Sequence, residues 1–170
     1  MCERITQYAN SAEYAAALGW TGLAPQALAQ PESAGFNIAP GAHPRVMHRL
    51  NAGARRIDRM RWGQVCSTPG QAREHDLKVQ TAATSPCFER LWREGRCIVP
   101  AEGWYEWQGE GRNRQPFRIH LPDDAPMFLA AIADYRPGAP VDAQGGFLLV
   151  TAQAGNGLLE LMTDPVFRVL

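Results

Sequence analysis

The run Trp104-Tyr105-Glu106-Trp107, the turn residues Gly109-Glu110-Gly111 after it and the run Phe117-Arg118-Ile119-His120 beyond decide the fold class. Aromatic and β-branched residues favour strands, and a short connection rich in glycine is typical of a hairpin between two antiparallel strands. Other strand-like runs lie at 36–39, 45–50, 96–99, 127–133 and 147–151. The sequence therefore predicts a mainly antiparallel sheet.

Three short helices are expected beside these strands. Ser11 is a suitable N-cap for a helix over 11–18, Ser85-Pro86 opens a second helix that ends at Gly95, and Asn156 caps a third. Short strands with few helices indicate an α+β domain whose sheet is strongly curved or barrel-like. We expect one domain over residues 1–170.

The composition is that of an ordinary globular protein. The chain has 170 residues, 45% of them hydrophobic, and 17 basic residues balance 17 acidic ones. The longest apolar run, Met127–Ala133, is too short to cross a membrane, and no signal peptide is visible at the start. These features predict a soluble, cytoplasmic monomer with no membrane partner.

The cysteines do not form a metal-binding pattern. Cys2, Cys66, Cys87 and Cys97 include no C-x-x-C pair and no histidine at zinc-finger spacing. We therefore expect no metal, no cofactor and no disulfide. Cys87 and Cys97 have apolar neighbours and are expected to be core thiols.

Arginine is concentrated between residues 42 and 63, where six arginines face one acid, Asp58. If 54–62 is a strand, alternation places Arg55, Arg59 and Arg61 on one face and Trp62 on the other. An arginine-lined face beside aromatic residues suits a nucleic-acid backbone. The alternative is an ordinary solvated strand face.

Cys2 combines two reactive groups if Met1 is removed. Its α-amine and thiol would then sit on adjacent carbons, and such an aminothiol condenses with an aldehyde to an imine that closes to a thiazolidine. An α-amino pKa of about 7.7–8.0, against about 10.4 for lysine, leaves far more neutral amine near pH 7.4. The alternative is that Cys2 has no functional role and occupies the second position by chance.

Glu106 is the candidate proton-transfer group. A half-buried glutamate between Tyr105 and Trp107 is expected to have a raised pKa and to exchange protons near neutral pH. The alternative is an exposed strand glutamate, because alternation points Glu106 away from both aromatic neighbours.

Several ordered blocks along nearly the whole chain carry a family resemblance. They are Met1-Cys2-Glu3-Arg4, Phe36-Asn37-Ile38-Ala39-Pro40, Met60-Arg61-Trp62-Gly63, Arg96-Cys97-Ile98-Val99-Pro100-Ala101, Gly103-Trp104-Tyr105-Glu106-Trp107, Arg114-Gln115-Pro116-Phe117 and Phe147-Leu148-Leu149-Val150-Thr151-Ala152-Gln153-Ala154. In these blocks the sequence resembles the SOS-response-associated peptidase (SRAP) family, whose members protect abasic sites in single-stranded DNA.

The resemblance implies a mechanism. Cys2 would join the ring-opened sugar of an abasic site as a thiazolidine, and Glu106 would act as an acid/base group. Arg4 and Asn37 would shape the DNA-binding site, with Trp62 nearby. The family name records a peptidase activity thought to expose Cys2.

The sequence also departs from the family pattern. Asp76 and Lys78 replace an asparagine and an arginine, Glu3 replaces a glycine, and Thr163 stands where the family has a histidine. Thr163 cannot carry a proton near pH 7, and a carboxylate at Asp76 would repel phosphate. The chain is also shorter at its C-terminal end than the family pattern.

We expect a divergent SRAP-like protein that binds single-stranded DNA and captures abasic sites through Cys2, with crosslinking and autopeptidase activity reduced by Thr163. The DNA contacts are expected from Arg4, Asn37, Arg59, Arg61, Trp62 and Lys78, and the chemistry from Cys2, Glu106, Asp76 and Thr163. Two alternatives are a DNA-binding module of the same fold that has lost its chemistry, and a thiol peptidase acting in trans.

Overall fold

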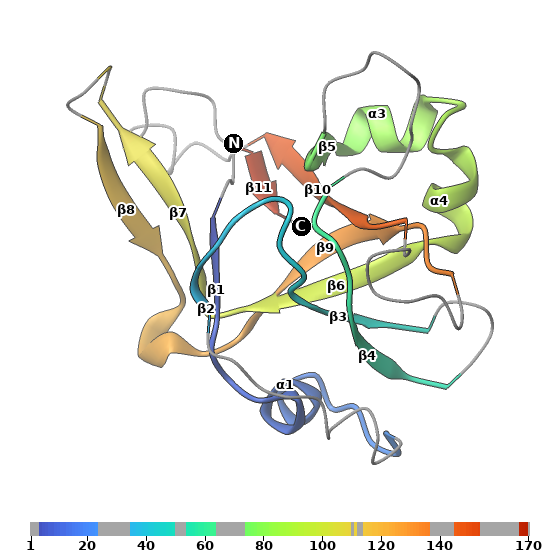
Figure 1. Cartoon of the computed structure of the whole chain (residues 1–170), viewed down its shortest axis with the longest axis horizontal. Helices are drawn as coiled ribbons and strands as arrows, with labels where there is room; N and C mark the ends of the chain where they lie inside the picture. The colour runs from blue at the N-terminus through green and yellow to red at the C-terminus, as the bar shows by residue number, and fades with distance from the viewer. Residues whose placement is uncertain are drawn as a thin grey trace.

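Two β-sheets packed face to face form the body of the molecule, with short helices at its edges (Figure 1). The structure is a computed structural model that describes residues 4–23, 35–49, 54–63, 74–109, 111, 114–136, 145–153 and 167–169. Neither sheet closes on itself, so the fold is α+β and mainly antiparallel, as predicted, without being a barrel.

The first sheet has four strands in the order β2-β1-β7-β8. Their bounds are β1 Ile5–Gln7, β2 Gly35–Ile38, β7 Gly103–Gln108 and β8 Gln115–Ile119. β7 and β8 pair antiparallel with Glu106 opposite Phe117, which confirms the hairpin predicted from the sequence. β1 pairs with β7 on its other side, so the start of the chain lies beside the Glu106 strand.

The second sheet follows the order β11-β10-β9-β6-β3-β4, and β5 pairs with β10. Its strands are β3 Arg45–His48, β4 Arg56–Arg59, β5 Asp76–Lys78, β6 Arg96–Ala101, β9 Met127–Ala133, β10 Phe147–Gln153 and β11 Phe167–Val169. Pairings along this order are antiparallel, whereas β5 runs parallel to β10.

The main hydrophobic core lies between the sheets. Ile5 of the first sheet belongs to one buried cluster with Phe147 and Leu149 of the second and with Trp62, which bridges to Phe147. Trp104 of β7 packs against this cluster. Burial of this apolar surface is the main force that holds the sheets together. The inner face of each sheet is therefore the face that carries these residues.

Helices cover the other face of the second sheet. They are α1 Ser11–Ala17, α3 Val79–Thr84 and α4 Glu89–Glu94. A separate 3-10 turn, η3, spans Pro122–Asp124 between β8 and β9. Leu91 of α4 packs on Ile132 of β9, and Tyr14 of α1 packs on Met47 of β3. Each helix thus buries one apolar stripe against the sheet.

The sequence-based elements need several corrections. Asn10, rather than Ser11, caps α1: it accepts a hydrogen bond from the Glu13 N–H, and Glu13 returns one to the Asn10 N–H. The second helix begins at Glu89, and α3 and β5 before it were missed. The strand expected over 54–62 is only β4, and the helix after Asn156 lies outside the described residues.

The two cysteines expected in the core differ from each other. Cys97 is buried and free, and burial raises the pKa of its thiol well above the usual range. Cys87 is exposed and disulfide-bonded, so both the prediction of a core thiol there and that of no disulfide are wrong. The apolar neighbours of Cys87 in the sequence pack elsewhere, as Phe88 does beside α4.

Candidate functional site

Glu106 is buried on β7, with only 4% of its surface exposed. It lies two residues after Trp104, so alternation projects both side chains from the inner face of the first sheet. Tyr105 and Trp107 project from the opposite face, with their rings 6.5 Å apart. The alternative of an exposed strand glutamate is therefore excluded.

The first described residue lies directly against this strand. The Tyr105 N–H donates a hydrogen bond of 3.0 Å to the carbonyl of Arg4. The next residue along, Ile5, stands opposite Trp104 in the β1–β7 pairing and is fully buried. The backbone just before β1 is thus attached to the strand that carries Glu106.

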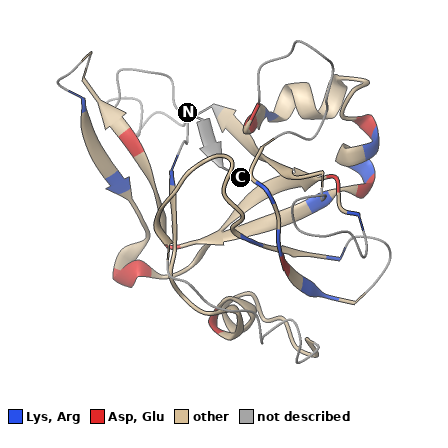
Figure 2. Ribbon diagram, viewed as in Figure 1, with Lys and Arg blue, Asp and Glu red and all other residues tan. Residues whose placement is uncertain are grey.

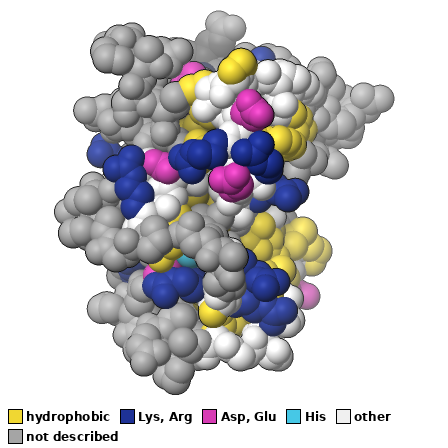
Figure 3. Space-filling model, turned by 90° about the vertical axis from the view of Figure 1, so that its right-hand side faces the viewer, with side chains coloured by type: hydrophobic (Ala, Val, Ile, Leu, Met, Phe, Trp, Pro, Cys, Tyr) yellow, Lys and Arg dark blue, Asp and Glu magenta, His cyan; other side chains and the backbone are white. Residues whose placement is uncertain are grey.

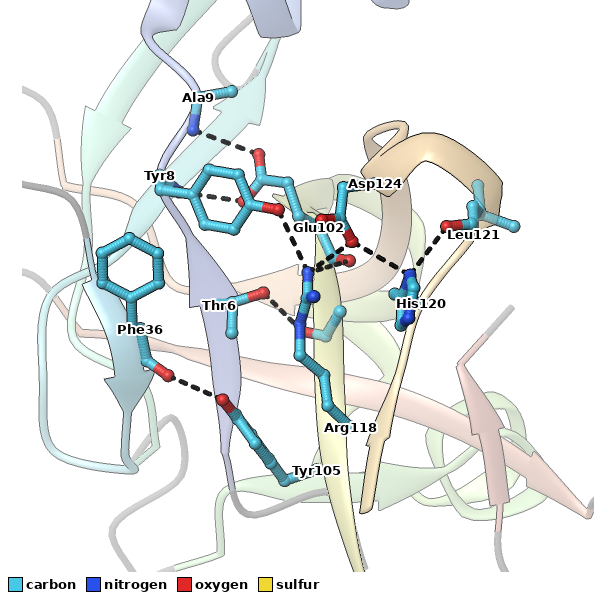
Figure 4. Close-up of polar contacts among 11 residues, drawn as sticks. Thr6, Tyr8, Ala9, Phe36, Glu102, Tyr105, Arg118, His120, Leu121 and Asp124 are labelled. Carbon is cyan, nitrogen blue, oxygen red and sulfur yellow. Dashed lines mark hydrogen bonds and ion pairs between the residues drawn. The ribbon is translucent and has the colours of Figure 1, made fainter. Parts of the chain in front are cut away.

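A polar network fixes the other end of β1 against β7 (Figure 4). Glu102, which is 1% exposed, accepts hydrogen bonds from the N–H groups of Tyr8 at 2.9 Å and Ala9 at 3.2 Å. Arg118 donates to the Tyr8 hydroxyl and to the Glu102 carbonyl, both at 3.1 Å, and forms an ion pair with Asp124. The hydrogen bond from Arg118 holds the pKa of Asp124 below its usual range. Both ends of β1 are therefore held.

Asp76 projects from the second sheet toward the same interior. In the parallel β5–β10 pairing Asp76 stands beside Leu149 of the inter-sheet core, so the two side chains share a face. Lys78, two residues on, shares that face and is exposed. Asp76 and Glu106 thus project from the two faces by which the sheets pack.

Next to Asp76 lies a cavity of about 120 Å³. Its lining is Pro40, Gly41, Arg61, Trp62, Gly63, Glu74 and His75. Trp62 is 1% exposed, stacks on Phe147 and donates its indole N–H to the carbonyl of His75 at 2.8 Å. Trp62 can therefore meet a ligand only through the edge that lines this cavity, which leaves its role in DNA binding a prediction.

The arginines of the basic segment have different surroundings. Arg61 lines the cavity and Arg59 donates to the carbonyl of His43, both half-buried. Arg55 lies over the Trp20 ring and donates to the carbonyl of Thr21. Asn37 is exposed on β2, next to β1. The structure thus distributes the predicted DNA contacts over both sheets.

Two residues of the predicted chemistry, Cys2 and Thr163, lie outside the described residues, as does Glu3. Their roles stay predictions. Two residues that the sequence reasoning missed do appear. The Nε2 atom of His75 lies 3.5 Å from Oδ1 of Asp76. Glu102 accepts a hydrogen bond from the N–H of Tyr8, the residue directly after β1. His75 could have been found because it directly precedes Asp76, whereas nothing in the sequence separates the role of Glu102 from that of Glu106.

The described residues show neither a metal-binding cluster nor a membrane-spanning helix. No group of three or more histidine, cysteine or acidic residues in them could hold a metal ion. In the same part of the chain, no helix is long and apolar enough to cross a membrane.

The fold and the order of the site residues define the class of protein. The family model described as SOS response associated peptidase (SRAP) matches residues 1–163. The chain therefore belongs to the SRAP family.

Curated relatives give the same assignment. The chain is 35% identical over 162 residues to the abasic site processing protein YedK of Escherichia coli. This alignment covers 95% of this chain and 72% of YedK. It is 30% identical to the abasic site processing protein HMCES of Gallus gallus over 105 residues, or 55% of this chain and 30% of that protein.

Solved structures agree with the fold. A phage-related protein from Bordetella bronchiseptica is similar with a TM-score of 0.74 and 31% identity, covering 88% of this chain and 68% of that one. A Bacteroides thetaiotaomicron protein at 19% identity, with a TM-score of 0.69 over 99% of this chain and 77% of that one, shares the fold alone.

Proposed function

We propose that this protein captures abasic sites in single-stranded DNA by forming a covalent bond from Cys2 to the ring-opened sugar. The observation that carries the proposal is the attachment of the chain start to the Glu106 strand, through the 3.0 Å hydrogen bond between Tyr105 and Arg4. The relatives named abasic site processing proteins support the same reaction class.

Chain length limits how far Cys2 can be from this strand. Cys2 is two residues from Arg4, and each residue spans at most about 3.8 Å between Cα atoms. Its Cα therefore lies within about 8 Å of the Arg4 Cα. Arg4 is hydrogen-bonded to Tyr105, the neighbour of Glu106. An amine and thiol at Cys2 are therefore close enough in the chain to act on the same aldehyde as the Glu106 carboxyl group.

The chemistry needs no redox partner. The Cys2 amine attacks the aldehyde, and water leaves as the imine forms. The thiol sulfur then adds to the imine carbon, its proton passes to the nitrogen, and a five-membered thiazolidine results. We assign Glu106 the proton transfers of the first step, because a buried carboxyl group at the reacting centre exchanges protons with the reactant rather than with bulk water.

The amine must first be free. Met1 blocks it, so removal of Met1 is part of the proposal, by the peptidase activity that the family name records. Arg4, Asn37, Arg59, Arg61 and Lys78 are assigned to the phosphates and bases, with the edge of Trp62 in the cavity. Thr163 offers no titrating group, so adduct formation is expected to be slow.

The test is incubation with a single-stranded oligonucleotide that holds one abasic site, followed by a denaturing gel and intact mass. We expect a conjugate heavier than the free protein by the oligonucleotide less one water, in protein that lacks Met1. Cys2→Ala is expected to abolish it, and Glu106→Gln to slow its formation at least tenfold. A conjugate that persists in Cys2→Ala would overturn the proposal.

A second candidate function is a DNA-binding module of this fold without the covalent step. The observation that favours it is the carboxylate of Asp76 on the inner face of the second sheet, where it would repel phosphate. This candidate predicts salt-sensitive binding of intact single strands, weakened by Arg59→Ala and Arg61→Ala, with no conjugate at any incubation time.

A further inference from the structure

Three arginines lie at the ends of three neighbouring strands: Arg49 directly follows β3, Arg55 directly precedes β4 and Arg96 begins β6. In the β3–β4 pairing Met47 faces Ile57 and His48 faces Arg56, so the next step along the same register places Arg49 opposite Arg55. In the β3–β6 pairing Met47 faces Ile98 and His48 faces Cys97, so Arg49 also stands opposite Arg96. We call Arg55, Arg49 and Arg96 the arginine row.

This row lies on the helix-covered face of the second sheet. Arg49 follows Met47 by two residues and Arg96 precedes Ile98 by two, and both Met47 and Ile98 pack toward α1. Asp76, in contrast, shares the inner face with Leu149. The arginine row and the proposed abasic site therefore occupy opposite faces of one sheet.

The charges of the row lack acidic partners within the part of the chain that the structure describes. Arg49 and Arg96 are exposed and make neither an ion pair nor a hydrogen bond there through their side chains. Arg55 lies over the Trp20 ring and donates a hydrogen bond to the Thr21 carbonyl. Lys and Arg positions gather at this end of β3, β4 and β6 (Figure 2). Several dark-blue side chains appear on this side of the molecule, with a few magenta ones between them (Figure 3).

Other arginines on the same side form ion pairs with acidic side chains, and in this they differ from the row. Arg90 and Arg136 share the carboxylate of Asp134 at 2.8 and 3.0 Å. Arg93 pairs with Glu94 at 3.1 Å, and Arg56 with Asp58 at 2.8 Å. Acidic partners are thus available on this surface, whereas the row pairs with no acid among the described residues.

Like charges directly opposite each other on adjacent strands destabilise a sheet. Side chains in this register have Cβ atoms about 5 Å apart, so three guanidinium groups repel one another unless an anion lies between them. A phosphodiester backbone supplies such anions at regular intervals, and the planar fork of arginine matches phosphate in two-point hydrogen bonding.

We propose that the arginine row binds the phosphate backbone of a DNA strand, as a second contact outside the abasic site. This inference rests on the proposed function only in that the chain encounters DNA. Because the row and Asp76 lie on opposite faces, only a strand longer than the site itself can reach both. The row would then hold flanking DNA while Cys2 acts on the lesion.

The experiment measures the affinity for undamaged single strands of two lengths, over a series of salt concentrations. The protein carries Cys2→Ala, so no covalent step contributes and the result is independent of the proposed chemistry. The variants are Arg49→Ala with Arg96→Ala, the charge-preserving Arg49→Lys with Arg96→Lys, and Arg93→Ala as the matched control. Arg93 is exposed on the same side, but it is paired with Glu94.

Each lost phosphate contact lowers the steepness of log affinity against log salt by about 0.7 for a single strand. For the long strand we expect the double alanine variant to lose about 1.4 in this slope, which is two contacts. The lysine variant is expected to keep the slope and lose affinity, and the short strand and Arg93→Ala are expected to bind as the parent does.

Thermal unfolding separates this result from a folding defect. Removing like charges is expected to leave the melting temperature of the double alanine variant unchanged or higher. Unchanged binding of the long strand by that variant would overturn the inference. An equal loss of affinity for the short and the long strand would also overturn it, because it would assign the row to the site already described. A variant that binds DNA as the parent does but no longer binds an acidic peptide would overturn it as well.

Discussion

Glu102 and Glu106 stand four residues apart, and both are buried. Glu102 accepts hydrogen bonds from two backbone N–H groups, of Tyr8 and Ala9, so its carboxylate is used by the fold. It also lies close to Tyr14, where burial, followed by the hydrogen-bonding interaction with the Glu102 carboxylate, raises the pKa of the phenol well above its usual range. Glu106 lies on the inner face toward Asp76 instead.

This contrast predicts opposite effects of the same isosteric change. Glu102→Gln leaves at least one buried N–H donor facing an amide NH₂, so the free energy of unfolding is expected to fall by about 1–3 kcal/mol. Glu106→Gln is expected to change stability by less and to slow adduct formation at least tenfold. Urea unfolding and the crosslinking rate, measured on both variants, check the pair; equal effects on both quantities would contradict the assignment.

Asp76 gives a second prediction at this scale. If its negative charge repels the DNA strand, Asp76→Asn is expected to raise the affinity for single-stranded DNA and the rate of adduct formation by about tenfold or less. Asp123→Asn, an exposed change in η3, serves as the control for the loss of one charge. No gain over that control would remove Asp76 from the DNA site.

At the scale of elements, the β3–β4 hairpin contains an ionic cluster. Nε2 of His48 lies 2.9 Å from Asp58, and Arg56 donates two hydrogen bonds to the same carboxylate. Burial acts to raise the pKa of Asp58, but the hydrogen bonds from His48 and Arg56 outweigh it and hold that pKa well below the usual range.

A carboxyl group with a lowered folded-state pKa stabilises the fold above its unfolded pKa of about 3.9, and the contribution is lost as the pH falls through the folded value. Asp58→Asn is therefore expected to destabilise the protein at pH 6 and to differ less and less from the parent below about pH 4. Urea unfolding at several pH values measures this. A gap of constant size down to pH 2.5 would show that the charge of Asp58 is not the cause.

Elements with continuous local patterns could be predicted from the sequence. Met127–Ala133 is a strand over the bounds expected from its apolar run, and the β7–β8 hairpin follows from its glycine turn. β1 and β5 were missed because each has three residues, too few to show alternation, and each is a strand only through distant pairing. The site depends on the same two strands, so its assembly could not be predicted without the fold.

Trp62 shows the same limit for a single side chain. The family resemblance placed it near the predicted DNA contacts, yet it fills the core against Phe147. The bridge that pairs Trp62 with Phe147 joins segments 85 residues apart, and no local pattern records it.

At the scale of the whole molecule, the two sheets share one core and are expected to unfold together. Ile5 is suited to test this, because it belongs to the first sheet and its side chain is buried in a cluster formed mostly by residues of the second sheet. Ile5→Ala removes core volume at that contact and is expected to lower the free energy of unfolding by about 2–5 kcal/mol. Leu121→Ala, at a position 42% exposed, is expected to cost much less.

The measurement compares urea unfolding of both variants followed by far-UV circular dichroism and by tryptophan fluorescence, because tryptophans occur in both sheets. Coincident curves with one midpoint are expected for a single cooperative unit. Separate midpoints would mean that the first sheet opens alone. In the cooperative case adduct formation by Ile5→Ala is expected to fall over the same urea range as its structure. Ile5 is three residues from Cys2, and the proposed reaction of Cys2 with the help of Glu106 requires β1 to stay paired with β7.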